Sequence, residues 1–167
     1  MKVIFSHGKE SGPWGIKIQR LAAIAKEHGC SVDSIDYTET HDPDVRAAKL
    51  VSVLKNETDD FLLVGSSMGG YVSLVASEQV TPKAIFLMAP ALYIADYKQQ
   101  KYSISLPPTE IVHGWADSVI PPENSINYAK KVNCSLHLIP GDHSLTSSID
   151  VVADIFRSFL LRIKIAE

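Results

Sequence analysis

The 167-residue sequence has few cysteines, no long apolar run and no excess of basic residues. Its two cysteines, Cys30 and Cys134, are too few for a disulfide framework and lack metal-ligand spacing. We therefore interpret them as reduced thiols of a cytoplasmic protein. No apolar stretch approaches the roughly 18 residues of a transmembrane helix, so no membrane span is expected. The apolar run after Met1 is also too short for the core of a signal peptide.

The charge is small and evenly spread. The net charge is -3 and lysines and arginines do not cluster, so we expect neither nucleic acid nor an anionic membrane as a partner. The chain contains no repeats or low-complexity segments. A hydrophobic fraction of 46% is typical of a globular protein, and the length predicts one domain over residues 1–167 with a substantial core.

Strand-like and helix-like patterns alternate along the chain. Short apolar or alternating runs predict strands, and a 3.6-residue period predicts the helices between them. The predicted strands are 3–6, 30–37, 61–64, 83–88, 109–113 and 136–139. The predicted helices are 16–27, about 43–55, 68–79, about 121–131 and about 148–163. Residues 89–108 are less regular and predict a loop with at most a short helix.

This alternation predicts a three-layer α/β sandwich with about six mostly parallel strands and helices on both faces of the sheet. The strand 61–64 is continuously apolar, as expected where both faces of a parallel sheet are buried. Sites in such sheets lie beyond the carboxyl ends of the strands. The candidate catalytic residues fall at such ends.

The segment Gly65-Ser66-Ser67-Met68-Gly69 is a G-x-S-x-G motif between a predicted strand and a predicted helix. That arrangement is typical of a nucleophile elbow, a sharp turn with an exposed serine at its tip. The two glycines stand where a Cβ would crowd the neighbouring strand or helix. By itself the motif fits a simple glycine-rich turn equally well, so Ser67 needs partners to be a nucleophile.

Two further residues supply the partners that a serine nucleophile needs. A serine hydroxyl requires a base, and the base requires an orienting group. In this kind of fold the acid and then the histidine follow the elbow in chain order. Asp117 follows the fifth predicted strand and His143 follows the sixth. We favour Asp117 over Asp142 as the acid because adjacent loop residues rarely reach each other's rings, and we assign His113 a structural role.

An acyl-transfer site also needs donors for the developing oxyanion. We assign one to the backbone N–H of Met68 and the other to the backbone N–H of Lys9, in the loop after the first strand; an ordinary glycine loop is the alternative for the latter. We expect an apolar, shallow pocket for short acyl chains near Ser67, with ordinary packing as the alternative for each residue. The expected pocket residues are Trp14, Tyr71, Tyr93, Val119 and Ile120.

Motifs along the whole chain resemble the α/β-hydrolase superfamily, in particular its small single-domain, lid-less, esterase-like members. They are His7-Gly8, Gly65 to Gly69, His113 to Asp117 with Ile120-Pro121, and Gly141 to His143. The resemblance implies a Ser-Asp-His hydrolase acting on small-molecule ester or related acyl substrates, with no cofactor and no metal. Because the His-Gly strand begins near residue 2, the usual first two of eight strands are expected to be absent, which gives a truncated α/β-hydrolase fold. No lid insertion is expected.

The function expected from these residues is that of a serine hydrolase, a carboxylesterase that forms an acyl-enzyme on Ser67. Two alternatives remain open. A thioesterase, amidase or peptidase would use the same three residues, and a non-catalytic binding protein would keep the scaffold without the chemistry.

Overall fold

The computed structural model describes residues 1–104 and 107–165. Ser105 and Leu106, within the predicted loop 89–108, and the last two residues lie outside the described part. The strands are β1 (Lys2–Ser6), β2 (Ser31–Ile35), β3 (Phe61–Ser66), β4 (Ala84–Met88), β5 (Thr109–Gly114) and β6 (Ser135–Ile139). The helices are α1 (Ile16–Glu27), α2 (Pro43–Leu54), α3 (Met68–Ser77), α4 (Pro122–Val132) and α5 (Ile149–Ile165), with a 3-10 turn at Thr146–Ser148.

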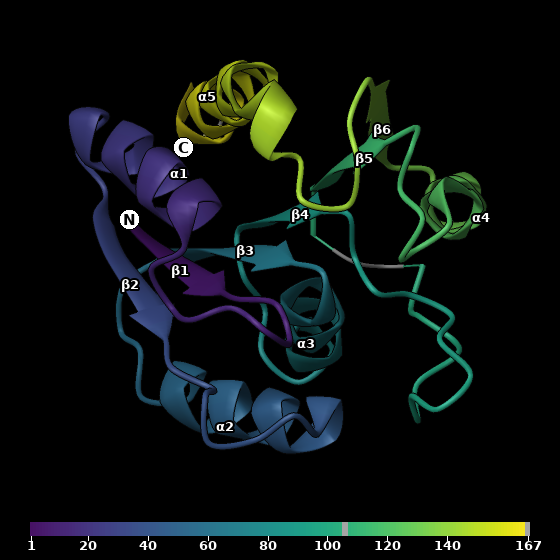
Figure 1. The fold of residues 1–167 in the computed structure, drawn as a ribbon. Helices are drawn as coiled ribbons and strands as arrows, with labels where there is room; N and C mark the ends of the chain where they lie inside the picture. Colours follow the sequence, from purple (N-terminus) through teal and green to yellow (C-terminus); the bar gives the residue numbers. More distant parts are fainter. Residues whose placement is uncertain (105–106, 166–167) are drawn as a thin grey trace.

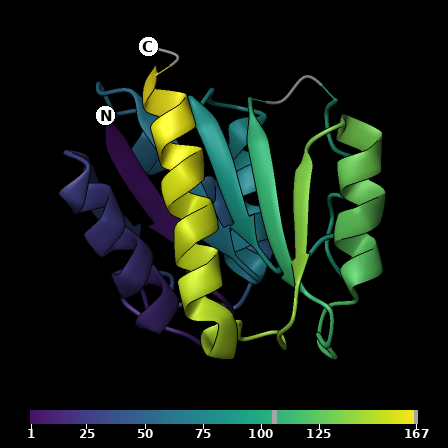
Figure 2. The ribbon, with the colours of Figure 1, turned by 90° about the horizontal axis from the view of Figure 1, so that it is seen from above.

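The strands form one six-stranded parallel sheet in the order β2-β1-β3-β4-β5-β6. Helices α1 and α5 cover one face, and α2 and α3 lie on the other, with α4 beside β5 and β6 (Figures 1 and 2). The predicted fold class is thereby confirmed. The predicted element boundaries also agree with the observed ones to within about two residues, and the described part of 89–108 contains no helix.

Successive side chains of each strand point to opposite faces of the sheet, and a separate hydrophobic core forms on each face. Val3 and Phe5 pack with α1 and α5, whereas Ile4 between them packs with α2 and α3. The same alternation holds in the central strand, where Leu62 faces the first core and Leu63 the second. Burial on both faces explains why the central strands are almost continuously apolar.

The order of the strands reverses beside β1. The chain passes from β1 to β2 on one side of it and then returns through α2 to β3 on the other. The loops after β1 and β3 therefore leave the sheet in opposite directions and open a crevice between them, which is the usual ligand position in such sheets. The register aligns Ser6 with Gly65, so both loops begin at the same level.

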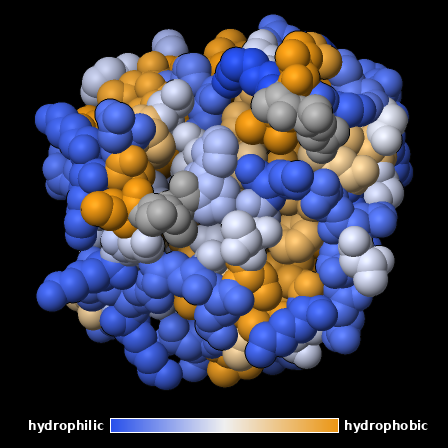
Figure 3. Space-filling model, turned by 180° about the vertical axis from the view of Figure 1, so that it is seen from behind, coloured by the Kyte–Doolittle hydropathy of each residue, from blue (hydrophilic) through white to orange (hydrophobic). Residues whose placement is uncertain are grey.

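The described helices include none that is long and apolar enough to cross a membrane. The face opposite to that of Figure 1 carries many hydrophilic residues, and its hydrophobic residues form separate patches (Figure 3).

Strand β1 and helix α3 approach so closely that only glycine fits between them. A Cβ built on Gly69 would lie 2.0 Å from the carbonyl oxygen of Ser6, and one built on Gly65 would lie 2.4 Å from the carbonyl oxygen of Gly69. Both neighbours are backbone atoms and cannot rotate away. This contact fixes the start of α3 against the ends of β1 and β3.

The change Gly69→Ala should therefore force β1 and α3 apart. We expect the free energy of unfolding to fall by about 3 kcal/mol or more, at the upper end of overpacking effects. The matched control is Gly12→Ala, because a Cβ there meets no atom within 4 Å and should change stability by less than about 0.5 kcal/mol. Chemical denaturation measures both, and equal stabilities of the two variants would contradict the close contact.

Candidate active site

Ser67 lies at the turn between β3 and α3 with an unusual backbone conformation. Its φ is 55° and its ψ is -119°, a combination that a non-glycine residue adopts only under constraint. The N–H of Ser67 donates to the carbonyl oxygen of Met88 at 3.0 Å, and its own carbonyl accepts from the N–H groups of Gly70 and Ala91, each at 2.9 Å. These bonds tie the turn to α3 and to the end of β4, and hold the strained conformation.

Three side chains from three loops meet in one line of hydrogen bonds. The Oγ of Ser67 lies 2.9 Å from Nε2 of His143, and Nδ1 of the same ring lies 2.7 Å from Oδ2 of Asp117. Since a carboxylate only accepts, the Nδ1–H of His143 donates to Asp117, which leaves Nε2 free to accept the hydroxyl proton. Residues separated by 76 and 26 positions in the sequence are thus brought into direct contact.

The Asp117 side chain is fully buried and receives four hydrogen bonds. Oδ1 accepts from the backbone N–H groups of Val119 and Ile120, both at 2.8 Å. Oδ2 accepts from His143 and, at 2.9 Å, from Nε2 of His113. Burial alone would raise the pKa of Asp117, but the hydrogen bonds from Ile120, His143 and Val119 outweigh burial and hold the pKa below its usual value. The carboxylate is therefore ionised at neutral pH.

His113 is a second histidine on the same carboxylate. Its Nε2–H is shared between Asp117 and the carbonyl of Ile120 at 3.0 Å, and its Nδ1 accepts from the Ser125 hydroxyl at 2.7 Å. Every ring nitrogen has a partner suited to the neutral form, and burial lowers the ring's pKa. His113 thus holds Asp117 in place. Sequence reasoning assigned it a structural role but missed this contact.

Asp142, the rival acid, bonds to its own loop, and Nδ1 of His143 bonds to Asp117 instead. Oδ1 of Asp142 accepts from the N–H and hydroxyl of Ser144 and from the N–H of Leu145, which makes it the first residue of a turn. Asp142 therefore shapes the loop that carries His143.

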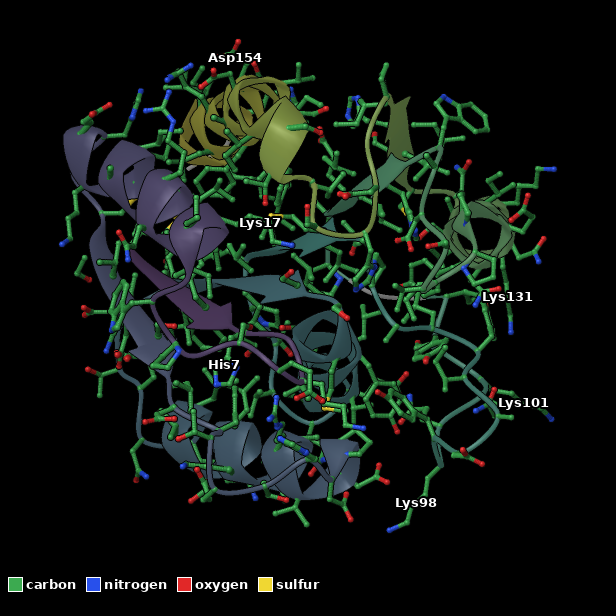
Figure 4. All side chains as sticks on the ribbon, in the orientation of Figure 1. His7, Lys17, Lys98, Lys101, Lys131 and Asp154 are labelled. Atoms are coloured by element: carbon green, nitrogen blue, oxygen red, sulfur yellow. The ribbon has the colours of Figure 1, made fainter. Side chains whose placement is uncertain are left out.

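The loop after β1 is held by two buried side chains: His7, which the sequence analysis named only as part of a motif, and Arg46, which it did not name. Nδ1–H of His7 donates to the carbonyl of Gly8 at 2.7 Å, and Arg46 donates to the carbonyls of Gly8 and Lys9 at 3.1 and 3.2 Å. Figure 4 places His7 between this loop and α2. In a planar trans peptide the N–H points opposite to the preceding C=O. Fixing the Gly8 carbonyl toward Arg46 therefore turns the Lys9 N–H away from α2.

The loop also lies directly against the serine. A Cβ built on Gly8 would be 3.6 Å from Cβ of Ser67. Met68 is the first residue of α3, where backbone N–H groups have no partner within the helix. Within residues 1–104 and 107–165, neither the Lys9 N–H nor the Met68 N–H donates a hydrogen bond. Two backbone N–H groups without a hydrogen bond among the described residues thus belong to the two segments that meet at Ser67.

A pocket of about 690 Å³ contains Ser67 and His143. Its walls are the loop after β1, the first turn of α1 and the loops after β4, β5 and β6. Val119 and Ile120 line it, as expected. Trp14, Tyr71 and Tyr93 are not among its lining residues, and Tyr97 supplies an aromatic ring that sequence reasoning missed.

Each of the three misplaced aromatics has a physical reason for lying elsewhere. Tyr71 points from α3 toward α2, where its hydroxyl donates to Asp44 at 2.9 Å. Trp14 lies on a loop with 43% of its surface exposed, and the ring of Tyr93 packs edge-on against Tyr102. None of these three residues lines the pocket of Ser67, because each side chain is directed by packing or exposure that its position in the sequence does not reveal.

A second pocket, of about 540 Å³, lies at the opposite ends of β5 and β6. Its polar residues include Glu110, whose carboxylate accepts from Arg162 and from His137. This second pocket is lined by none of the residues Ser67, Asp117 and His143. In the described part of the chain, no group of three or more His, Cys, Asp and Glu side chains is placed to hold a metal ion.

Comparison with solved structures gives the class of protein. A protein of the alpha/beta hydrolase superfamily from Xanthomonas campestris pv. campestris matches with a TM-score of 0.89 and 28% identity, over 96% of this chain and 98% of that one. Est1E from Butyrivibrio proteoclasticus matches with a TM-score of 0.84 and 20% identity, over 99% and 88%. XC6422 from Xanthomonas campestris, an α/β serine hydrolase without a lid, matches with a TM-score of 0.66 and 18% identity, over 96% and 81%. The resemblance to the α/β-hydrolase superfamily is confirmed.

A family model then places the chain within that class. Residues 2–146 match the model of the uncharacterised protein family UPF0227, and the chain belongs to this family. None of the curated proteins matches the sequence. The comparisons support a hydrolase in general and do not identify its substrate.

The hydrogen bonds of Arg46 predict a combined effect on stability and activity. Its side chain is fully buried, so Arg46→Met leaves the carbonyls of Gly8 and Lys9 without these donors. We expect the free energy of unfolding to fall by about 2 to 4 kcal/mol, since the buried guanidinium makes three hydrogen bonds, to the carbonyls of Thr40, Gly8 and Lys9, and a methionine makes none of them. If the Lys9 N–H assists a reaction at Ser67, kcat for the activated ester p-nitrophenyl acetate should also fall by about tenfold or more, because this N–H loses its orientation.

The matched control is Arg20→Met, which removes an exposed arginine whose ion pair with Asp150 lies on the surface. It should change stability by less than about 1 kcal/mol and leave kcat unaltered. Kinetics are measured at a temperature where both variants are folded. An Arg46→Met variant with wild-type kcat would show that Arg46 does not position the loop for catalysis.

Proposed function

We propose that this chain is a serine hydrolase that cleaves carboxylic esters of small or short-chain acyl groups through an acyl-enzyme on Ser67. The observation that carries the proposal is the line of hydrogen bonds from Ser67 through His143 to Asp117. A hydroxyl, a ring nitrogen free to accept its proton and an ionised, buried carboxylate are the three parts of an activated serine nucleophile.

In the acylation step, Oγ of Ser67 attacks the carbonyl carbon of the ester while its proton moves to Nε2 of His143. Asp117 holds the ring in the required tautomer and stabilises the imidazolium that forms. The tetrahedral intermediate then collapses, the bond to the alcohol oxygen breaks, and His143 returns the proton to the leaving alcohol. The products of this step are the free alcohol and an ester of Ser67.

Deacylation repeats the sequence with water as the nucleophile. His143 takes a proton from water, the hydroxide oxygen attacks the acyl carbon, and the proton is delivered to Oγ as Ser67 leaves. In both steps the carbonyl oxygen becomes negative, and the N–H groups of Met68 and Lys9 stabilise that charge. The α3 N-terminus contributes further, because the helix dipole favours negative charge there.

The residues that line the pocket are evidence for small substrates. Charged groups line it close to apolar side chains: Lys9, Glu10 and Lys17 share its walls with Ala91 and Ile120. A long alkyl chain would have to bury methylene groups against these charged groups, which is unfavourable. The pocket is therefore better suited to short acyl groups than to fatty acyl chains.

The role of Ser67 is tested by the variant Ser67→Ala. Turnover of p-nitrophenyl acetate should fall by at least about a thousandfold, because the nucleophile is absent. Labelling by a fluorophosphonate probe should disappear as well. The melting temperature should stay within a few degrees of the wild-type value, since alanine adopts the same backbone conformation as serine.

The matched control is Ser158→Ala, which removes an exposed hydroxyl on α5 that donates to the carbonyl of Asp154. Labelling and turnover should be unaltered in this variant. Undiminished turnover in Ser67→Ala would exclude Ser67 as the nucleophile. A wild-type protein that neither hydrolyses esters nor reacts with the probe would be a binding protein on a hydrolase scaffold.

The size of the acyl group is tested with p-nitrophenyl esters of increasing chain length. We expect kcat/KM for the acetate and butyrate to exceed that for the laurate by about tenfold or more, as expected when several methylenes cannot be buried. Concentrations are kept below the critical micelle concentration of the laurate. A higher kcat/KM for the laurate would contradict the proposed short-chain preference.

A further inference from the structure

Two lysines, Lys9 and Lys17, line the candidate active site without a side-chain partner among the described residues, and of the two only Lys17 is partly buried. It stands in the first turn of α1, and its side chain extends over the sheet (Figure 4). It lines the same pocket as Ser67 and His143. Within residues 1–104 and 107–165 it makes no hydrogen bond and no ion pair. The proposed reaction uses none of its atoms.

Four other lysines of the described residues pair with carboxylates: Lys2, Lys49, Lys83 and Lys98. Lys2 contacts Glu57 at 2.8 Å, and Lys49 contacts Glu39 at 2.6 Å. Among the described residues no carboxylate oxygen lies within 4.0 Å of the Lys17 ammonium; Asp117 is bonded to its four donors and Asp142 to its own turn. Retaining a partly buried ammonium in such a place has a free-energy cost that a bound anion would offset.

The surroundings of Lys17 favour an anion over other ligands. Burial lowers the pKa of Lys17 to about 8, with Asp117 and Asp142 acting in the opposite direction, so the group is still mostly protonated at neutral pH. Ile18 and Ile120 contribute apolar walls to the same pocket, where charge-assisted hydrogen bonds are stronger than in water. A neutral ligand would leave the charge unmatched and a cationic one would be repelled.

We propose that Lys17 binds a carboxylate carried by the ester substrate, so that the protein acts preferentially on anionic esters. The inference rests on the proposed function for the ester bond itself. It adds the chemical class of the substrate and a specificity-determining residue. The carboxylate can belong to the acyl part or to the alcohol part of the ester, and the two cases are separated by the choice of substrate.

The test compares charged and neutral esters of similar shape in the wild type and in Lys17→Met. For the acyl part the pair is mono-p-nitrophenyl adipate and p-nitrophenyl hexanoate. For the alcohol part it is 4-acetoxybenzoate and its methyl ester. In at least one pair, Lys17→Met should lower kcat/KM for the charged ester by about tenfold or more and change the neutral ester by less than about threefold.

The matched control is Lys26→Met on the same helix, because Lys26 is exposed in the last turn of α1, away from the pocket. It should leave both kcat/KM values unchanged. Lys17→Met should melt no lower than the wild type, since it removes a partly buried charge. An equal loss for the charged and neutral members of both pairs, or no loss at all, would overturn the proposal.

The pH dependence supplies a second readout. The charged groups that face Lys17 or share its pocket are Lys9 and Glu10 after β1, Asp117 after β5, and Asp142 with His143 after β6. Deprotonation of Lys17 removes the attraction, so the charged-to-neutral ratio of kcat/KM should be constant well below pH 8 and fall above it. In Lys17→Met the ratio should not change over this range.

A direct binding measurement separates this inference from the proposed function. Calorimetric titration with adipate and with 4-hydroxybenzoate needs no turnover. At least one of them should bind the wild type about tenfold or more tightly than Lys17→Met. If neither acid distinguishes the two proteins, the carboxylate site is excluded even where ester hydrolysis is found. If at least one acid binds the wild type more tightly than Lys17→Met but no ester is hydrolysed, the carboxylate site stands and only the proposed ester hydrolysis is contradicted.

Discussion

The backbone of Ser67 is held at a positive φ, and the geometry of the site depends on that constraint. A serine relaxed into an ordinary conformation would extend β3 and turn its hydroxyl away from His143. The contact between Gly69 and Ser6, together with the bonds from Ser67 to Met88 and Ala91, prevents this. Strain of about 1 to 3 kcal/mol at one residue is thus balanced by packing that involves β1, β3, β4 and α3.

A second constraint acts on the acid. Asp117 is a buried carboxylate, and such a group is tolerated only when its oxygens are saturated with donors. Two backbone N–H groups and two histidines meet this need. Because His113 is neutral and fully bonded, it restricts the carboxylate without competing for the proton that His143 is proposed to carry. The end of β5 is therefore rigid, whereas the His143 loop is nearer to solvent.

The sequence was informative where function depends on local geometry or chain order. The elbow around Ser67, and the positions of Asp117 and His143 after late strands, follow from short motifs and strand ends. Arg46 and His113 were missed as supports because their partners lie on other elements, and no local pattern reveals such a contact. Tyr71 was misplaced for a related reason: its direction is set by the packing of α3 on α2, which the sequence near the elbow does not encode.

The pocket is assembled from parts that serve different purposes. Loops at the ends of β1, β3, β5 and β6 carry the proposed chemistry, and all of them are anchored by the sheet. One wall, however, is the first turn of α1, a helix that packs on the opposite face from α2 and α3. Ile16 and Lys17 in that turn contribute little to either core. Under the proposed function, substrate preference can therefore diverge between relatives through a few exchanges in one helical turn, while Ser67, Asp117 and His143 stay under the separate and stricter demands of folding.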